Sequence, residues 1–528
     1  MPTGFGVSDL EERLAPIGPL AAGISVSSRV TFLDTFDWRV HRAGWSLELA
    51  GEGTRGRLRL RSLEGGRPLA RHAGPPVRLA VELPAGALRD RLAPVLGPRA
   101  LLAFADAELT ETPLTLQANA GRSSVRLKFE SALIAPPGAP PTLPLRPLLS
   151  IPATARAVAV SALVAAWPDC EPAPSDRVAA VLEPLGRTPR DYSGKVKVPL
   201  NGSIPARDAA RALLLHLLGT LEANLPGVRN DIDPEFLHDM RVAIRRTRSA
   251  IGQLKGVLPP ATAARFTREF AWLQEMTGPA RDLDVYVYEL PGMGRLLPAR
   301  ARRSLGPLAR LLERRRHATH AALAREMDSS RFSRLLADWR AFLLLPTPRR
   351  PTGAPNALQP CADLAAKRIG RLYRRALREG AAIAAESPAA DLHELRKTCK
   401  KLRYLVEFFQ SLLEREEADA AIAALKVLQD TLGRFQDLQV QADALVGYAR
   451  ELAREAKAPP PAYVALGMLI ERLREEQVRG RRDFSGHFGA FAHGSNRKRW
   501  KRLIAAVAAA RDSAADSPAA HDREDDCG

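Results

Sequence analysis

Hydrophobic positions follow two different periods along the chain. Between residues 24 and 135, apolar residues alternate with polar or cationic ones in short segments bounded by Gly and Pro. A period of two is typical of strands with one buried face, so this region predicts an antiparallel, β-barrel-like sheet with a few helices. The expected strands are ISVSSRVTFL, GWSLEL, GRLRLRS, VRLAVELP and SSVRLKFESALI.

From about residue 204 the period becomes that of a helix, in segments rich in Ala, Leu, Arg and Glu. Pro-rich stretches, LPTPRRPTGAP and APPPA, separate some of these segments and predict linkers. Another Pro-rich stretch, APPGAPPTLPLRP, follows the strand-like region. The candidate helices are residues 206–225, 234–257, 261–277, 300–325, 361–385, 390–413, 417–432 and 463–484.

The change of pattern divides the chain into parts. At 528 residues it exceeds the usual size of one domain. We expect an α+β multidomain fold, with a β-rich domain over residues 1–200, an all-α domain over 201–510 and an acidic disordered tail over 511–528. The all-α domain is expected to hold two repeats, about 204–340 and 359–490.

These two repeats are related by a constant offset. LHDMRVAIRRTRSAI, which begins at Leu237, returns as LHELRKTCKKLRYLV at Leu392, 155 residues later. The same offset continues into the following helix, where Gly278 matches Gly433. A constant register across several helices predicts duplicated helical hairpins and therefore a pseudo-symmetric domain.

Charge is concentrated in the helical region. The chain has 78 Lys and Arg against 59 Asp and Glu, a net charge of +19. Residues 201–510 carry a net +18, residues 1–200 carry +5 and the last eighteen residues carry −4. An excess of this size implies an anionic partner for the helical region: a nucleic acid, a membrane surface or a phosphate polymer.

The repeated helix places its cations on one face. Residues 238, 241, 245 and 248 are spaced by three and four, beside an apolar stripe formed by Leu237, Met240, Ile244, Ile251 and Leu254. The second copy has the same arrangement. Like charges at this spacing repel, so a bridging polyanion would relieve the repulsion and gain charge-assisted hydrogen bonds. One such face alone is typical of solvated surface, whereas its repetition in register favours a binding site.

The two copies of L-H-x-x-R, each followed by a helix with LQ-x-x-x-G-x-x-x-D, resemble the CHAD domain over about residues 204–490. The resemblance implies two four-helix bundles related by a pseudo-twofold axis, with a basic central pore that binds inorganic polyphosphate. The resemblance also implies that cations of the two repeated helices are the polyphosphate ligands. Further candidate cations lie on neighbouring segments. The candidate ligands are His238, Arg241, Arg245, Arg246, Arg248, His393, Arg396, Lys400, Lys401, Arg403, Arg207, Arg211, Lys367, Arg371, Arg374 and Arg375.

The N-terminal part is similar to the CYTH domain of the triphosphate tunnel metalloenzymes, on the segment FLDTFDWRVHRAGWSLEL. Catalytic CYTH domains carry an E-x-E-x-K motif whose carboxylates bind a divalent metal. Only MPTGFGV precedes the first expected helix here, and the late strand expected at ARAVAVSALVAAW has no acidic residue. We therefore expect a degenerate domain without metal, cofactor or catalytic residues. Arg57, Arg59 and Arg61 either retain some anion affinity or form the solvent face of a strand.

The sequence leads to three functional hypotheses. The leading hypothesis is a polyphosphate-binding protein, with association with polyphosphate granules as a further hypothesis. The alternative is a metal-dependent inorganic triphosphatase that acts through the CYTH-like domain. A nucleic-acid binder is disfavoured by the 5% aromatic content, so nucleic acid is expected only as a weak, non-specific competitor. Four widely spaced cysteines and the lack of a signal peptide or apolar span predict a cytoplasmic protein without a membrane partner.

Overall fold

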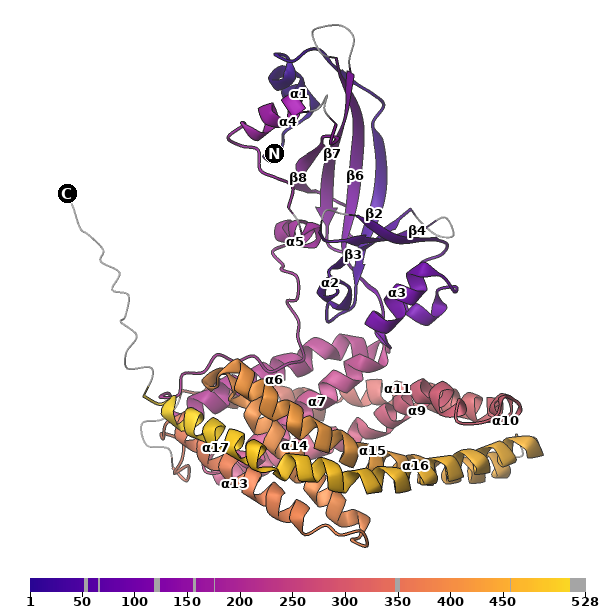
Figure 1. Ribbon diagram of the computed structural model, residues 1–528, viewed down its shortest axis with the longest axis vertical. Coiled ribbons are helices and arrows are strands. Elements are labelled where there is room, and N and C mark those ends of the chain that lie inside the picture. The colour runs from indigo at the N-terminus through magenta and orange to yellow at the C-terminus, as the bar shows by residue number, and fades with distance from the viewer. Residues whose placement is uncertain are drawn as a thin grey trace, which may run out of the picture. The chain divides into compact units, whose positions relative to one another are not determined.

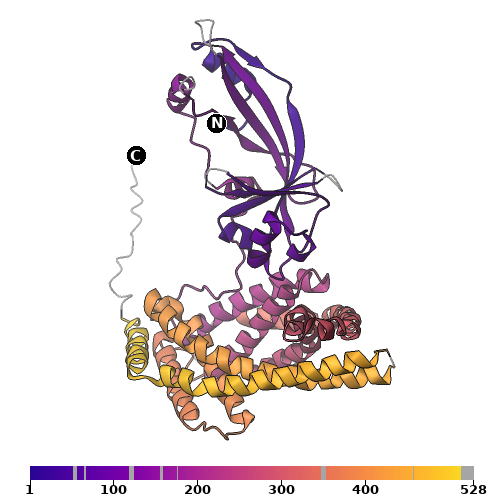
Figure 2. The ribbon, with the colours of Figure 1, turned by 45° about the vertical axis from the view of Figure 1, so that its right-hand side comes forward.

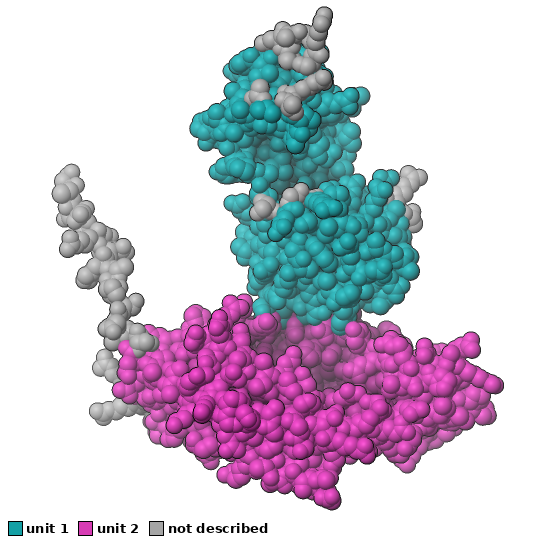
Figure 3. Space-filling view, viewed as in Figure 1, with its two compact units in different colours: residues 1–193 teal, residues 194–528 magenta. Residues whose placement is uncertain are grey.

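The chain folds into two compact units, Met1–Ser193 and Gly194–Gly528 (Figures 1 and 3). The structure is a computed structural model. The expected tail at 511–528 lies almost wholly outside the described residues. The structure describes residues 1–51, 56–64, 67–117, 124–154, 158–174, 176–346, 352–455 and 457–512.

The first unit is built on one antiparallel sheet in the order β5-β4-β3-β2-β6-β7-β8, with β1 paired to β6. Among the described pairings β5 and β8 are the end strands, so the sheet is open rather than closed into a barrel. Alternation sets its faces, since Leu58 and Leu60 are buried between exposed arginines on β4. The strands are β1 (Leu20–Ala22), β2 (Val26–Asp34), β3 (Trp45–Ala50), β4 (Arg57–Ser62), β5 (Pro68–Ala73), β6 (Leu102–Gln117), β7 (Ser124–Ala135) and β8 (Leu143–Ser150).

Two expected strands of this unit are wrong. VRLAVELP contains only a 3₁₀ turn, Ala80–Glu82, before helix α3 (Ala87–Leu96). ARAVAVSALVAAW contains a helix, α4 (Val158–Ala165), because its apolar run is Ala-rich and short runs of this kind do not distinguish strand from helix. The remaining helices are α1 (Val7–Leu14), α2 (Arg39–Arg42) and α5 (Arg177–Leu182), with a 3₁₀ turn at Glu183–Leu185.

The second unit is all-helical in its described residues (Figure 1). Its helices carry their apolar positions inward, and the expected stripe of the repeated helix is confirmed, since Leu237, Met240, Ile244, Ile251 and Leu254 are all buried. The helices are α6 (Ala206–Arg229), α7 (Pro234–Gln253), α8 (Pro260–Met276), α9 (Gly278–Gly294), α10 (Ala299–Arg303), α11 (Gly306–Met327), α12 (Ser330–Leu344), α13 (Cys361–Ala381), α14 (Ala389–Phe408), α15 (Arg415–Arg454), α16 (Pro460–Ala492) and α17 (Gly494–Ala509), with a 3₁₀ turn at Gln410–Leu412.

The offset of 155 residues is present in the helix boundaries. Helices α6, α7 and α8 begin 155 residues before α13, α14 and α15, respectively, and α7 ends 155 residues before α14. The repeats diverge at the next break: α8 ends before Gly278, whereas α15 continues through Gly433 to Arg454. One long helix of the second repeat therefore corresponds to two helices of the first.

Backbone hydrogen bonds between the repeats occur in reciprocal pairs. Ala206 N donates to the Gln359 carbonyl at 2.8 Å, and its counterpart Cys361 N donates to the Ile204 carbonyl at 2.9 Å. Pro205 pairs with its own counterpart, Pro360, in an antiparallel bridge. Contacts in which i meets j and j meets i are those a twofold axis imposes. The two repeats are therefore related by a pseudo-twofold axis at the start of α6 and α13, and α7 packs against α14.

One hydrophobic core is shared between the repeats. It joins α9 and α11 of the first repeat to the C-terminal half of α15 and to α16, which lie side by side (Figure 2). Leu312 and Tyr286 pack there with Leu445 and Leu469, all buried. Two independent bundles would each have a core of their own. This core instead contains residues of both repeats, so it stabilises their association.

Trp339 of α12 packs against aromatic side chains of α8. Its side chain is fully buried against Phe266 and Phe270 of α8, with ring centroids 4.4 and 5.5 Å away. We expect Trp339→Ala to lower the free energy of unfolding of the helical unit by about 3–5 kcal/mol, because it leaves a large cavity. Urea denaturation checks this, with Val427→Ala, at a half-exposed position on α15, as the control. A loss below about 1 kcal/mol would contradict the packing described here.

Candidate functional site

Eleven Lys and Arg side chains of the helical unit line a cleft of about 1070 Å³. We call it the basic cleft. It is formed by α7 and the residues after it, by α8, and by α13 and α14. Its lining residues are Arg245, Arg248, Ser249, Gly252, Gln253, Lys255, Thr267, Gln274, Arg368, Arg371, Leu372, Arg374, Arg375, Arg378, Glu379, Lys397, Lys400, Lys401 and Tyr404.

Local sequence places the cations of α7 on this cleft. Asp233 caps the helix, accepting hydrogen bonds from the backbone N–H groups of Glu235 and Phe236 at 2.9 and 3.3 Å, and Pro234 occupies the first turn. With the start of the helix fixed and Ile244 in the core, the turns that follow direct Arg245 and Arg248 beside the core and into the cleft.

The basic cleft has little internal neutralisation. Glu379 is the one carboxylate among its lining residues in the described chain, and it accepts a 2.5 Å hydrogen bond from Arg375. Within the described residues, Arg245, Arg371, Arg374 and Lys400 have no carboxylate at ion-pairing distance. Eleven of the nineteen lining residues are Lys or Arg, so the cleft has a strongly positive field that a polyanion would neutralise.

Burial and mutual repulsion alter the ionisation of these cations. Burial, together with the charges of Arg396 and Arg245, lowers the pKa of Lys400 to about 8. Burial lowers the pKa of Arg368, with a further contribution from Arg371. Arg245 Nε is buried and has no hydrogen-bond partner in the described part of the chain. An anion in the cleft would offset both the desolvation and the repulsion.

The arginines at the head of each repeated helix are bound within the protein instead. Arg241 donates to the Gln274 carbonyl and to Thr277 Oγ1, both at 2.7 Å, where α8 ends. Burial first, and Arg245 second, lower its pKa to about 10. Its counterpart Arg396 donates to Gln436 Oε1 at 3.1 Å and pairs with an Asp437 oxygen at 3.2 Å. These two arginines hold the hairpins of the repeats together.

Two glycines at equivalent positions lie under these arginines. A methyl group added at Gly278 would lie 3.8 Å from Arg241, and one at Gly433 would lie 3.4 Å from Arg396. The repeated sequence therefore contains two kinds of residue: cations that are ligand candidates, and residues such as Arg241 and Gly278 that stabilise the helical hairpin.

The sequence-predicted residues fall into three groups. Seven line the basic cleft: Arg245, Arg248, Lys400, Lys401, Arg371, Arg374 and Arg375. A second group makes internal contacts: Arg241, Arg246, His393, Arg396 and Arg403, with Arg207 buried over the Phe342 ring and Arg211 paired with Asp208. The last two, the exposed Lys367 and the half-buried His238, do not line the cleft.

Four cations of the basic cleft are absent from the sequence-predicted set: Lys255, Arg368, Arg378 and Lys397. A signal for two of them was present. Arg368, Arg371, Arg375 and Arg378 repeat the three-four-three spacing of the recognised stripe, along α13. Lys255 follows the end of α7, and only the tertiary fold brings it to the cleft.

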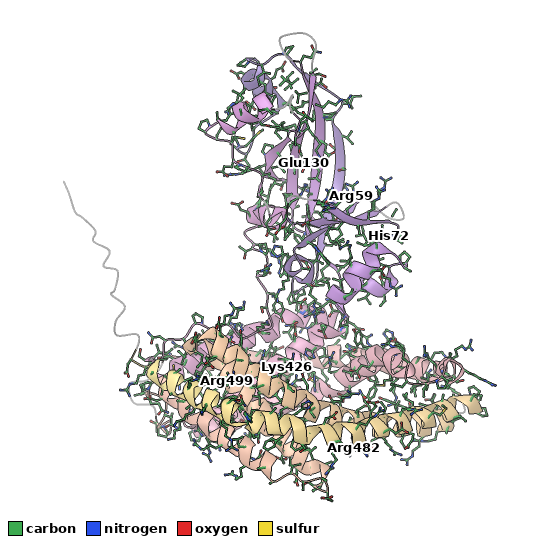
Figure 4. All side chains as sticks on the ribbon, in the orientation of Figure 1. Arg59, His72, Glu130, Lys426, Arg482 and Arg499 are labelled. Carbon is green, nitrogen blue, oxygen red and sulfur yellow. The ribbon has the colours of Figure 1, made fainter. Side chains whose placement is uncertain are left out.

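Two buried glutamates of the first unit are engaged by basic side chains. Glu48 on β3 accepts from Arg61 at 3.3 Å, and Glu130 on β7 (Figure 4) accepts from Arg177 at 2.8 Å. Lys128 lies 3.5 Å from Glu130. Carboxylates held by arginine and lysine do not fit the ligand set of a divalent metal, which needs them for the cation itself. Arg57 and Arg59 are exposed on β4, whereas Arg61 is half-buried and pairs with Glu48 (Figure 4 labels Arg59).

The aromatic-x-D-T-x-D turn of this unit has a structural role. Asp34 accepts hydrogen bonds from the backbone N–H groups of Thr35, Val40 and His41 at 2.6, 2.9 and 2.9 Å. Burial raises its pKa to about 6, although these bonds act in the opposite direction. Asp37 is held by Arg39 and Arg99. The two carboxylates therefore fix the turn before α2.

An all-helical unit of duplicated hairpins around a cleft of cations defines the class of domain. Residues 212–446 match the family model of the CHAD domain, so the helical unit contains a CHAD domain. The antiparallel sheet of the first unit fits the CYTH-like resemblance.

Two solved structures are similar to the chain. The CHAD domain from the plant Ricinus communis is 26% identical, over 57% of this chain and 96% of that chain, with a TM-score of 0.48. PptA from Streptomyces chartreusis is 22% identical, over 54% of this chain and 99% of that chain, with a TM-score of 0.41. No curated protein matches the chain. Across the described residues, none of the helices has the length and apolarity that crossing a membrane requires.

Proposed function

We propose that the helical unit binds inorganic polyphosphate in the basic cleft. The observation that carries the proposal is the cluster of eleven cations, with one carboxylate among the described lining residues, in a cleft of about 1070 Å³. Arginine can bind phosphate oxygens with two parallel N–H groups, and lysine acts as a compact point charge. A linear polymer with a charge on every unit would satisfy many of these cations at once.

The lining favours a phosphate polymer over a nucleic acid. Single-stranded nucleic acids are bound by aromatic side chains on which bases stack, in addition to cations. Tyr404 is the one aromatic residue among the lining residues in the described chain. The guanidinium groups of Arg246 and Arg403 already lie 5.8 and 5.7 Å from its ring centre. The cleft thus offers dense charge without a stacking surface.

Titration of the full chain with polyphosphates of defined length tests the proposal. Affinity is expected to rise with chain length until the cleft is filled, and to fall steeply as salt increases, because each phosphate contact releases bound counterions. An affinity independent of both chain length and salt would contradict a polyelectrolyte site.

Binding is also expected to depend on pH through Lys400. With its pKa lowered to about 8, Lys400 is charged at pH 7 and mostly neutral at pH 9. A bound polyanion favours the charged form, so the complex takes up a proton above pH 8 and affinity falls by up to about tenfold per pH unit there. Calorimetric titration at pH 7 and 9 measures this. In Lys400→Arg the fall between these pH values should disappear, and its persistence would assign the pH dependence to another group.

The alternative of a metal-dependent triphosphatase stays a prediction from the CYTH-like resemblance. Release of phosphate from tripolyphosphate with Mg²⁺ or Mn²⁺ tests it. Because Glu48 and Glu130 are engaged by Arg61, Arg177 and Lys128, we expect no release above the rate without protein.

Association with polyphosphate granules follows from the proposed binding and is tested by imaging the tagged chain in cells with and without stored polyphosphate.

A further inference from the structure

The pseudo-twofold axis predicts a second cleft, on α6, that mirrors the basic cleft on α13. The two faces differ in sequence. Where α13 presents Arg371, Arg374 and Arg375, the counterpart positions of α6 are His216, Gly219 and Thr220. The second face therefore lacks the row of cations that forms one wall of the basic cleft.

The second face is covered by the first residues of the helical unit itself, 194–200, which we call the covering segment. Arg246 donates to the Gly194 carbonyl at 2.7 Å, His216 Nε2 lies 3.2 Å from the Lys195 carbonyl, and Gln410 donates to the Val196 carbonyl at 2.6 Å. Leu200 N donates to Ser411 Oγ at 3.1 Å, and Val196 is 3% exposed. The segment is thus held at both ends.

The side chains that hold the covering segment are the counterparts of cleft cations. Arg246, His216 and Gln410 lie 155 residues from Lys401, Arg371 and Lys255, respectively, and all three of these cations line the basic cleft. On the second face, the carbonyl oxygens of residues 194, 195 and 196 contact these three side chains. In the basic cleft, an anion would contact the three counterpart cations at the same positions.

A carboxylate neutralises the same face. Glu407 pairs with Arg246 at 2.8 Å and with Arg403 at 3.2 Å, whereas its counterpart in the basic cleft is Gly252. Arg246 therefore donates to one carbonyl and one carboxylate, and a phosphate group there would meet the charge of Glu407.

We propose that the covering segment fills the pseudo-symmetric half of the anion site, so that polyphosphate binds only at the α13 face and does not pass between the repeats to the α6 face. Arg246 then holds the covering segment, while its counterpart Lys401 contacts the polymer. This inference rests on the proposed function, since it specifies which half of the duplicated site the polymer uses.

The matched pair Arg246→Ala and Lys401→Ala in the full chain tests it, because both changes remove one cation at equivalent positions. With long-chain polyphosphate, Lys401→Ala is expected to weaken binding about tenfold, and Arg246→Ala less than about twofold. Amide hydrogen exchange of residues 194–200 in the unchanged protein should not increase when polyphosphate is added. Gln410→Ala, which loosens the covering segment without a change of charge, should likewise leave affinity within about twofold.

The outcomes separate the inference from the function. If the unchanged protein binds polyphosphate but both alanine variants lose affinity equally, or exchange of the covering segment rises on binding, the polymer uses both faces and the inference is wrong. If the unchanged protein does not bind polyphosphate, the proposed function fails. If Arg246→Ala is misfolded by circular dichroism, the exchange measurement on the unchanged protein and Gln410→Ala decide the question.

Discussion

Replacing Arg245 and Lys400 together by glutamate is expected to weaken polyphosphate binding by about 1,000-fold. These two residues are counterparts across the pseudo-twofold axis, and the positive charge of Arg245 lowers the pKa of Lys400, so they lie close together in the basic cleft. Reversal of a desolvated cation removes a charge-assisted hydrogen bond and adds repulsion, which costs about 2 kcal/mol or more at each position.

The control for this variant has the same change in net charge at exposed positions. Arg415 and Lys426 on α15 are exposed and do not line the basic cleft (Figure 4 labels Lys426). Arg415→Glu with Lys426→Glu should therefore change affinity by less than about threefold at physiological salt. Equal losses in the two double variants, measured by calorimetric titration, would show that net charge rather than the cleft governs binding. Circular dichroism confirms that both variants are folded.

Exchanging the cationic row of α13 for the residues of α6 is expected to have the next largest effect. The variant Arg371→His, Arg374→Ala and Arg375→Thr copies the α6 positions, with alanine in place of glycine to preserve the helix. Affinity for polyphosphate should fall about 100-fold at pH 7.5. The slope of log affinity against log salt is negative, and its magnitude should become smaller by about two to three, because that many phosphate contacts are lost.

A control removes as many cations from another helix. Arg472, Arg474 and Arg482 on α16 are exposed and do not line the basic cleft (Figure 4 labels Arg482). Their replacement by His, Ala and Thr should leave the salt slope unchanged within about one. An unchanged affinity in the α13 variant would contradict the assignment of this helix as a wall of the polyphosphate site.

The helical part of the fold could be predicted from the sequence because its signals are local and repeated. The apolar stripe of α14, which includes Leu392, Leu395, Cys399 and Leu402, is buried as its period predicts. The 155-residue offset also placed the equivalent helix starts. The length of α15 could not be read in the same way: Gly433 matches a helix break in the first repeat, yet the second repeat packs its continuation against α9, α11 and α16.

The site could be predicted only in part, because symmetry in sequence does not decide which face of a duplicated helix is open. The stripe spacing identified Arg245, Arg248 and Lys400, which line the basic cleft. It equally included Arg241, whose guanidinium group contacts Gln274 and Thr277 at the end of a neighbouring helix. That contact depends on where α8 ends, and the spacing of cations on α7 gives no information about the end of another helix.

Competition between labelled long-chain polyphosphate and single-stranded RNA of matched charge tests the central claim most directly. It is made on the full chain at about 150 mM salt, where charges farther apart than about 8 Å are screened. If the basic cleft is a dedicated polyphosphate site, polyphosphate displaces RNA readily. RNA then displaces polyphosphate only at a concentration about 100-fold or more above the polyphosphate concentration that displaces RNA. Displacement at equal concentrations would show a general cationic surface and would contradict the proposed function.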